Sequence, residues 1–316
     1  MSSPAVSVVM PCFNAARHLA NSVRSVQVQT FTAWELLIVD DGSTDESRAI
    51  AAELASGDPR IRLLHQENKG PGAARNAGLA AAQAPLLAFL DSDDTWCPEF
   101  LATMVAALDG TAPDAIAYCG WQNKGLGAGR DAPYIPPDYE AGDKSAALLR
   151  SCPWPIHGAL VRRQAVLAVD GFDATLKSCM DYDLWLRMAL DATLVRVPRV
   201  LAYYHHHGTG QITGDKVRLA TNHLLVQRRF LAAHPEVSRR LGHRRVRELT
   251  LGILLQRAYE AYWRRDLPAA RTLFRAVMRE GYGGPRDWRY MLAAWLPVQW
   301  HAGLIKIRDS YPSPPA

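Results

Sequence analysis

Strand-like and helix-like segments alternate over about 90 residues at the start of the chain, which constrains its fold more than any other feature. Short apolar runs that predict strands occur at 6–10, 34–39, 61–64 and 86–90. Periodic segments that predict helices occur at 16–28, 46–55, 73–82 and 99–108. This alternation is typical of parallel strands joined by crossover helices. We therefore predict an α/β fold with a doubly wound, parallel sheet and a site along one edge.

Acidic turns follow two of these predicted strands, at Asp40-Asp41 and at Asp91-Ser92-Asp93-Asp94. Ligands of open α/β sheets bind outside the carboxyl ends of the strands, where loops line a crevice. Asp91 and Asp93 are two positions apart, so both can face one hard cation. The alternative is an acidic turn in which Asp94 caps a helix that begins near Pro98. The residues alone leave both interpretations open.

The rest of the chain divides at about residue 214. Further strands are predicted at 115–118, 159–161 and 193–204, and helices at 163–169 and 181–190. Residues 122–143 are rich in Gly, Pro and Asp and predict a long irregular loop. From residue 215 onward the pattern is helical. We expect an α/β domain at 1–214 and a basic helical region at 215–316.

The charge distribution and the cysteine content limit the classes of partner and the cellular compartment that are expected. Residues 215–316 hold 19 Lys+Arg and 8 Asp+Glu, a balance of +11; subtracting these from the totals of 36 and 31 leaves 17 − 23 = −6 for residues 1–214. The first region therefore gives no reason to expect a nucleic-acid partner. Five cysteines without a CxxC pair suit a reducing compartment, and the first residues lack the pattern of a signal peptide. We expect a cytoplasmic protein.

The C-terminal region has an uncharged run at 290–305, which is shorter than the roughly 20 residues of a membrane span. Trp288, Trp295 and Trp300 lie in or beside this run, with Arg and Lys on both flanks. This arrangement suits either a peripheral membrane contact through 286–308, at the inner face of the plasma membrane, or a buried terminal helix with a basic rim.

Five stretches together resemble the family 2 glycosyltransferases with the GT-A fold. They are 8–14 (VVMPCFN), 38–45 (IVDDGSTD), 70–78 (GPGAARNAG), 89–94 (FLDSDD) and 181–187 (DYDLWLR). Each stretch is a weak signal alone, but their order and spacing are those of the family, and the resemblance covers about residues 5–208. It implies a mixed, mainly parallel sheet in a nucleotide-diphospho-sugar transferase fold.

The resemblance implies a nucleotide and metal site. Pro11, Phe13 and Asn14 would border the nucleotide, Asp41 would accept a hydrogen bond from its base, and Arg75 and Asp91 would contact it further. A carboxylate facing an imide N–H favours uracil or thymine, so a UDP- or dTDP-sugar donor is expected. Asp93 and His207 would meet Mn²⁺ or Mg²⁺. The structural alternatives are that Asp40 orients its loop and that Arg75 forms a surface ion pair.

Asp181 matches the catalytic base of the family, which accepts the proton of an acceptor hydroxyl. Its alternative role is a helix N-cap. Met180 departs from the common pattern, because the family often has Glu there. Trp154 and His157 would line the acceptor or sugar pocket, or else pack as buried aromatics before a strand.

The implied activity is transfer of a sugar, with inversion, from a nucleotide-diphosphate donor to a sugar or lipid-linked hydroxyl acceptor in cell-surface polysaccharide or glycolipid synthesis. A dehydrogenase and a nucleotidyltransferase are disfavoured, because no Gly-rich phosphate loop follows the first strand. The remaining alternative is a catalytically impaired, sugar-nucleotide-binding scaffold of a membrane-associated complex. Met180 favours it and the intact acidic residues oppose it.

Overall fold

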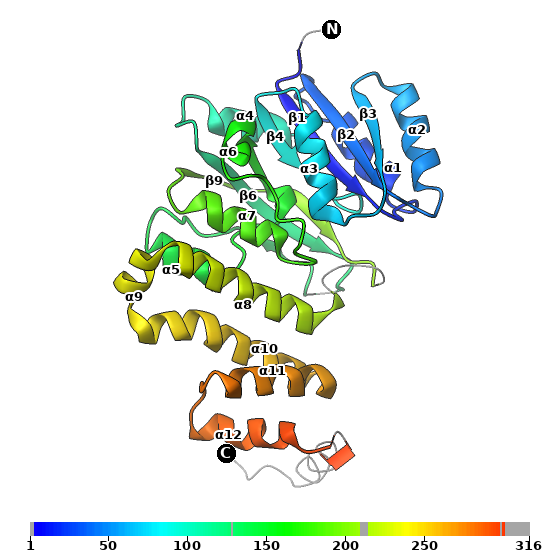
Figure 1. Cartoon of the computed structure of the whole chain (residues 1–316). Coiled ribbons are helices and arrows are strands. Elements are labelled where there is room, and N and C mark those ends of the chain that lie inside the picture. The colour runs from blue at the N-terminus through cyan, green and yellow to red at the C-terminus, as the bar shows by residue number, and fades with distance from the viewer. Residues whose placement is uncertain (1–2, 128, 209–213, 298, 301–316) are drawn as a thin grey trace. The chain divides into compact units, whose positions relative to one another are not determined.

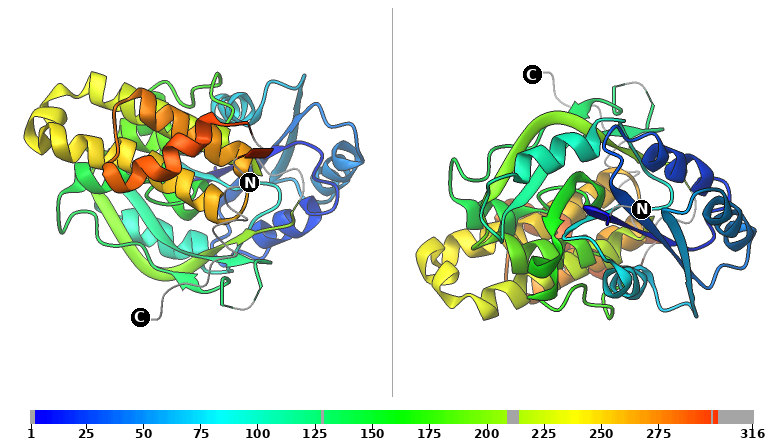
Figure 2. Two further views of the ribbon diagram at one scale, coloured as in Figure 1. Left: turned by 90° about the horizontal axis from the view of Figure 1, so that it is seen from below. Right: turned by 90° about the horizontal axis from the view of Figure 1, so that it is seen from above.

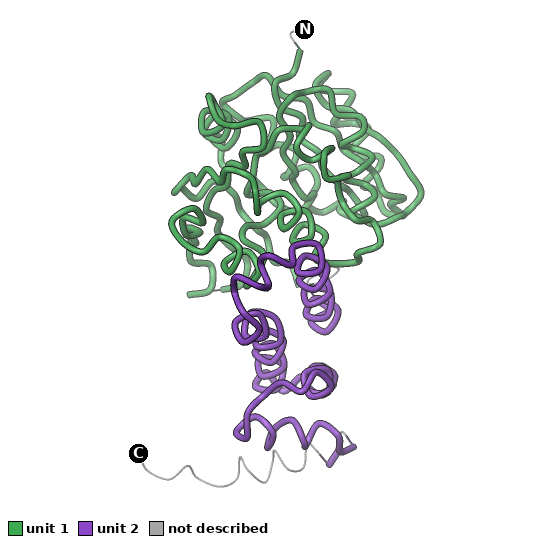
Figure 3. Tube along the Cα trace, turned by 60° about the vertical axis from the view of Figure 1, so that its left-hand side comes forward, with its two compact units in different colours: residues 1–211 green, residues 212–316 purple. Residues whose placement is uncertain are grey.

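The computed structural model describes residues 3–127, 129–208, 214–297 and 299–300. The chain forms two compact units, residues 1–211 and residues 212–316 (Figure 3). The first unit is an α/β domain built on one sheet. The described part of the second unit is helical.

One nine-stranded sheet organises the first unit (Figure 1). Its strands are β1 (Val6–Cys12), β2 (Trp34–Asp41), β3 (Ile61–Gln66), β4 (Leu86–Phe89), β5 (Thr95–Trp96), β6 (Ile116–Lys124), β7 (Pro133–Tyr134), β8 (Ala159–Arg162) and β9 (Leu194–His205). The order is β3-β2-β1-β4-β8-β6-β9-β5, and β7 pairs with β6. Strands β1 to β4 are mutually parallel, as are β6 and β9, whereas β8 runs antiparallel between β4 and β6. The expected mixed, mainly parallel sheet is confirmed.

Helices cover both faces of this sheet (Figure 2). They are α1 (Leu19–Gln27), α2 (Ser47–Gly57), α3 (Pro71–Ala81), α4 (Phe100–Leu108), α5 (Lys144–Arg150), the short η1 (Ile156–Gly158), α6 (Arg163–Leu167) and α7 (Met180–Ala189). The even-numbered residues of β1 share one apolar core with α1, α2 and α4. On the other face α3 lies so close that a Cβ at Gly78 would be 2.3 Å from Val9. Only glycine permits this approach.

The parallel register brings several carboxyl ends of strands to the same edge. Cys12 pairs with Asp40 across β1 and β2, and Val9 pairs with Phe89 across β1 and β4. Lys124 pairs with His205 at the ends of β6 and β9. The loops that carry the candidate site residues therefore leave the sheet on one side.

The predicted loop at 122–143 begins later than expected, because β6 continues to Lys124. The polar residues Gln122 and Asn123 lack the apolar alternation of a strand, but they pair with Tyr203 and Tyr204 of β9. The strand predicted at 193–204 is present as β9, which spans Leu194–His205.

The second unit consists of helices that pack around a core of their own. They are α8 (Lys216–Ala233), α9 (Pro235–Arg247), the π-helical turn η3 (Glu248–Gly252), α10 (Ile253–Trp263), α11 (Leu267–Arg279), α12 (Pro285–Met291) and η4 (Leu292–Trp295). Ala258, Phe274 and Met291 are fully buried in this core. Asp215 and Asp266 cap α8 and α11 through their side chains. Among the described residues, we find no helix with the length and apolar character to cross a membrane.

Candidate active site

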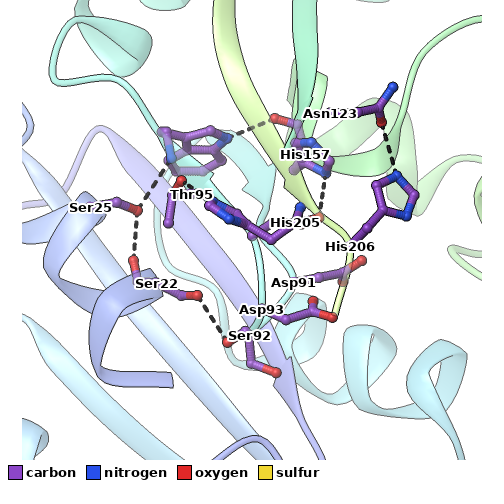
Figure 4. Close-up of polar contacts among 12 residues, drawn as sticks. Ser22, Ser25, Asp91, Ser92, Asp93, Thr95, Asn123, His157, His205 and His206 are labelled. Carbon is purple, nitrogen blue, oxygen red and sulfur yellow. Dashed lines mark hydrogen bonds and ion pairs between the residues drawn. The ribbon is translucent and has the colours of Figure 1, made fainter. Parts of the chain in front are cut away.

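The three carboxylates of the acidic turn after β4 differ in solvent exposure. The Asp94 N–H donates to the Asp91 carbonyl at 3.0 Å, which closes the turn. The side chains of Asp91 and Asp93 remain 28% and 26% exposed, whereas that of Asp94 is 1% exposed. Figure 4 shows Asp91 and Asp93 together beside the loop. The alternative that Asp94 caps the next helix is wrong, because Glu99 is the N-cap residue of α4.

Asp93 meets His207, which follows β9. His207 Nε2 lies 2.9 Å from Asp93 Oδ2. The His207 ring also stacks on His18, with ring centroids 4.5 Å apart and planes 24° apart. His18 occupies the N-cap position of α1 but forms no side-chain cap bond. His18 is not among the residues predicted from the sequence, where its only signal is its place shortly after the expected nucleotide loop.

The donor set of Asp93 and His207 fits a divalent cation. A carboxylate oxygen and an imidazole nitrogen can both ligate Mn²⁺ or Mg²⁺. Within the described ranges, no group of three or more His, Cys, Asp or Glu side chains is arranged to hold a metal ion. Two protein ligands suit a cation that takes its other ligands from diphosphate oxygens and water.

Arg75 lies beneath the acidic turn. Its side chain is 5% exposed, and Nη2 donates to Asp91 Oδ1. Its Nε and Nη1 are buried and have no hydrogen-bond partner. The guanidinium also lies over the Phe172 ring, 5.5 Å from its centroid. Arg75 is therefore not a surface ion pair, and its two unpartnered donors need an acceptor, since buried donors are rarely left unpaired.

Asp40 and Asp41 hold the loops around them. Asp40 accepts from the Ser43 N–H at 3.1 Å and lies 2.9 Å from His65 Nδ1, which confirms the alternative that Asp40 orients its loop. Asp41 accepts three hydrogen bonds from other residues and is 2% exposed. Its donors are the Gln66 side chain and the N–H groups of residues 69 and 70. Direct contact of Asp41 with a nucleotide base is not supported by these surroundings, because the carboxylate is already buried and bonded.

The loop after β1 carries the other expected nucleotide residues. Pro11 is buried within β1, whereas Phe13 is 48% exposed. Asn14 has a positive φ of 50°, and its Oδ1 accepts from the Thr44 N–H at 2.8 Å. Phe13 thus presents an accessible ring, and Asn14 joins this loop to the loop after β2.

Asp181 is the second residue of α7. Cys179 is its N-cap residue, at a φ of 61°, so the alternative that Asp181 is the N-cap is wrong. Burial raises the pKa of the Asp181 carboxyl, although the Tyr182 N–H and Arg75 lower it. The Cys152 thiol donates weakly to Asp181 Oδ2 over 3.8 Å. The charges of Arg75 and Asp91 both act on this carboxyl, so it belongs to the same cluster.

The helix that carries Asp181 is held firmly. Arg187 donates to Asp183 and to the carbonyls of Val169 and Gly171. Trp185 is fully buried. Arg187 thus braces the helix that carries Asp181, and Trp185 packs it against the interior.

Trp154 and His157 do not line an open pocket. Each is 1% exposed. The Trp154 ring stacks on Tyr118 with centroids 4.5 Å apart, and His157 Nδ1 lies 2.9 Å from Asp94 Oδ2. The expectation of an acceptor or sugar pocket at these residues is therefore wrong, because both side chains are enclosed by packing.

Comparison with known proteins identifies the family of the chain. The family model described as glycosyl transferase family 2 matches residues 7–166. The O-antigen biosynthesis protein RfbC of Myxococcus xanthus is 33% identical over 189 residues, which are 59% of this chain and 14% of RfbC. The chain spans about a third of the length of several curated bacterial relatives named as glycosyltransferases.

Two solved structures share the fold. S. aureus TarS 1–349 in complex with UDP superposes with a TM-score of 0.55 at 19% identity, over 97% of this chain and 92% of that one. The mannosyltransferase PcManGT from Pyrobaculum calidifontis, in complex with GDP-Man and Mn²⁺, gives a TM-score of 0.56 at 18% identity, over 98% and 89%. The expected GT-A fold is confirmed.

Proposed function

The chain belongs to glycosyl transferase family 2, and we propose that it transfers a sugar from a nucleotide-diphosphate donor to a hydroxyl acceptor with inversion of configuration. The observation that carries this proposal is the cluster at the sheet edge. Two buried donors of Arg75 lack acceptors, and the Asp93–His207 pair lies at the same acidic turn. A diphosphate with a divalent cation would satisfy both features.

The proposed chemistry is a single displacement. Asp181 accepts the proton of the acceptor hydroxyl as that oxygen forms a bond to the anomeric carbon. The bond from the anomeric carbon to the diphosphate oxygen breaks on the opposite face, so the configuration inverts. Arg75 donates hydrogen bonds to the nucleotide diphosphate. When Mn²⁺ or Mg²⁺ is held by Asp93 and His207, it supplies positive charge that stabilises the leaving diphosphate.

The proposed donor is a UDP- or dTDP-sugar. The burial of Asp41 removes the argument that this carboxylate selects uracil or thymine. Support comes instead from TarS, which has the same fold and was solved with UDP and with UDP-GlcNAc. PcManGT was solved with GDP-Man, so a GDP-sugar is the competing donor, and binding experiments must distinguish it from a UDP- or dTDP-sugar.

The proposed acceptor is a hydroxyl of a growing polysaccharide or of a lipid-linked sugar. The support is the likeness to a protein named for O-antigen biosynthesis. The region matched by the family model contains Asp93 and ends before Asp181. The alternative, a sugar-nucleotide-binding scaffold, would bind the donor and leave it unreacted.

Calorimetric binding of UDP, dTDP, GDP and ADP, with and without Mn²⁺, tests the proposal on wild type and on Asp93→Ala. We expect one nucleotide to bind more tightly with Mn²⁺, and we expect Asp93→Ala to lose this gain while retaining the metal-free affinity. Failure of every nucleotide to bind the folded wild type would refute the transferase function. Metal-dependent binding followed by no transfer to any polysaccharide or lipid-linked acceptor would favour the scaffold.

The second unit is proposed to contact an anionic membrane, at the inner face of the plasma membrane. Trp288, Leu292 and Trp295 are spaced as one stripe on α12 and η4 and are 42%, 55% and 49% exposed. Arg286 and Arg289 are exposed beside the stripe. The alternative of a buried terminal helix is wrong for these tryptophans. Residues 298 and 301–308 of the expected contact lie outside the described residues.

Co-sedimentation with vesicles containing phosphatidylglycerol tests the membrane contact. The triple variant Trp288→Ser, Leu292→Ser, Trp295→Ser should lose binding, because aromatic and aliphatic side chains supply the interfacial burial. Val28→Ser with Leu167→Ser is the matched control, since both side chains are exposed apolar residues of the first unit, at 45% and 37%. Equal sedimentation of the triple variant and wild type would contradict the contact.

A further inference from the structure

A buried ion pair lies directly behind the acidic turn. His157 Nδ1 and Asp94 Oδ2 are 2.9 Å apart, and each side chain is 1% exposed. The proposed chemistry uses neither residue. Taking two ionisable groups out of water is costly, so a pair in such a place calls for an explanation beyond packing.

Asp94 links the two segments that carry the proposed metal ligands. It follows Asp93 in the chain, and its Oδ1 accepts from the His205 N–H at 2.9 Å. His205 lies two residues before His207. One carboxylate therefore ties the acidic turn to the end of β9, which otherwise belong to distant parts of the sequence.

Neighbouring contacts fix the same junction from other sides. Thr95 Oγ1 lies 2.9 Å from His205 Nε2 (Figure 4). The Trp96 indole N–H donates to the His157 carbonyl at 2.7 Å. The His157 ring stacks near Tyr204, with centroids 5.9 Å apart. The acidic turn, β5, η1 and the end of β9 are thus joined around one buried carboxylate.

We propose that Asp94 and His157 are positioning residues that set the separation and orientation of Asp93 and His207 for a divalent cation. The inference rests on the proposed function, because it assigns a purpose to that same metal site. His157 holds the Asp94 carboxylate in place, and Asp94 holds the His205 backbone. Loss of the His157 imidazole, whose Nδ1 lies 2.9 Å from the Asp94 carboxylate, would let the carboxylate turn away, and the two ligands would no longer face a shared cation. Groups that orient metal ligands in this indirect way affect metal affinity about 10- to 100-fold when removed.

The test compares His157→Leu with His157→Asn. Asparagine can place a side-chain N–H near the position of Nδ1 and so present a polar hydrogen to Asp94, whereas leucine cannot. The measured quantity is the ratio of UDP affinity with Mn²⁺ to UDP affinity without it, with GDP run in parallel. We expect His157→Leu to lower this ratio by about 10- to 100-fold and His157→Asn to restore most of it. Metal-free nucleotide affinity should stay within about twofold of wild type, because Arg75 is unchanged.

A second pair of variants covers the case in which His157→Leu does not fold. Thr95→Val removes the hydroxyl that contacts His205 but leaves no buried charge unpaired, and Thr95→Ser keeps a hydroxyl. Loss of one hydrogen bond should lower the Mn²⁺ ratio about fivefold in Thr95→Val and leave it near wild type in Thr95→Ser.

Two results would overturn the positioning role. One is a ratio of UDP affinity with Mn²⁺ to UDP affinity without it that is the same in folded His157→Leu as in wild type. If His157→Leu does not fold, the same result in Thr95→Val counts instead. The other is an equal loss of affinity with and without Mn²⁺, which would indicate general loosening of the fold. If wild type binds a nucleotide without any gain from Mn²⁺, the metal part of the proposed function fails and the positioning role fails with it. If His157→Leu loses only the increase in nucleotide affinity that Mn²⁺ gives to wild type, the proposed function and the positioning role are both supported.

Discussion

Replacing Arg75 with methionine separates a ligand-binding role from a structural one. In the wild type, the guanidinium donates to Asp91 and leaves two buried nitrogens, Nε and Nη1, without acceptors. Each unsatisfied buried donor costs about 1–3 kcal/mol, and a hydrogen bond to a charged group contributes about 1.5–3 kcal/mol. Removing two unsatisfied donor atoms gains about 2–6 kcal/mol, whereas losing the bond to Asp91 costs about 1.5–3 kcal/mol. We therefore expect Arg75→Met to lower the free energy of unfolding by no more than about 1 kcal/mol.

The nucleotide affinity should respond far more strongly. Each lost hydrogen bond to a diphosphate oxygen, at about 1.5–3 kcal/mol, weakens binding about 10- to 150-fold. Arg75→Lys is the matched control, because it keeps the charge but lacks the planar fork, so its affinity should be intermediate. Urea unfolding gives the stability, and calorimetry with UDP and with GDP gives the affinity.

One combination of results would refute a ligand-binding role for Arg75. If Arg75→Met loses more than about 3 kcal/mol of stability, as expected when a structural buried pair is broken, and still binds the nucleotide normally, then Arg75 only neutralises Asp91. The diphosphate would then have to be bound elsewhere.

Three further predictions concern the base and the metal ligands. Asp181→Asn should lower kcat by about 100- to 10,000-fold in a donor-consumption assay while leaving donor affinity nearly unchanged; a variant with normal kcat would remove Asp181 as base. Burial raises the pKa of Asp181, and a base acts in its deprotonated form, so the acid limb of the kcat–pH profile should lie above the ordinary range of an aspartate; a profile that stays flat through that region would contradict this. His18→Ala should reduce the gain in UDP affinity from Mn²⁺ by about 2- to 10-fold, because a stacked ring pair contributes about 0.5–1.5 kcal/mol. His18→Phe keeps an aromatic ring and should retain the gain. Equal affinities of the two variants would show that the stacking of His18 on His207 does not support metal binding.

The sequence predicted the local elements of the first unit and their order. Short apolar runs predicted the strands β1 to β4, and the acidic residues at the ends of two runs predicted the edge of the sheet where the site lies. These features depend on neighbouring residues, so periodicity is enough to find them. The polar end of β6 was missed because its pairing with β9 is not local.

The tertiary structure decided which acidic and aromatic residues face the site. The sequence offers three carboxylates within four positions, but only the turn and its partners reveal that Asp91 and Asp93 face outward and Asp94 faces His157. His157 lies 63 positions from Asp94 along the chain (157 − 94), and no periodic pattern reports a contact at such a separation. The same holds for the stacking of His18 on His207.

Local patterns determined the elements and the edge at which the chemistry is expected. The orientation of each side chain at that edge depended on sheet register and on the packing between loops, and these long-range contacts exist only once the sheet has formed. That is why Asp41 and His157, assigned to ligands on the basis of sequence position, are instead buried and bonded within the protein.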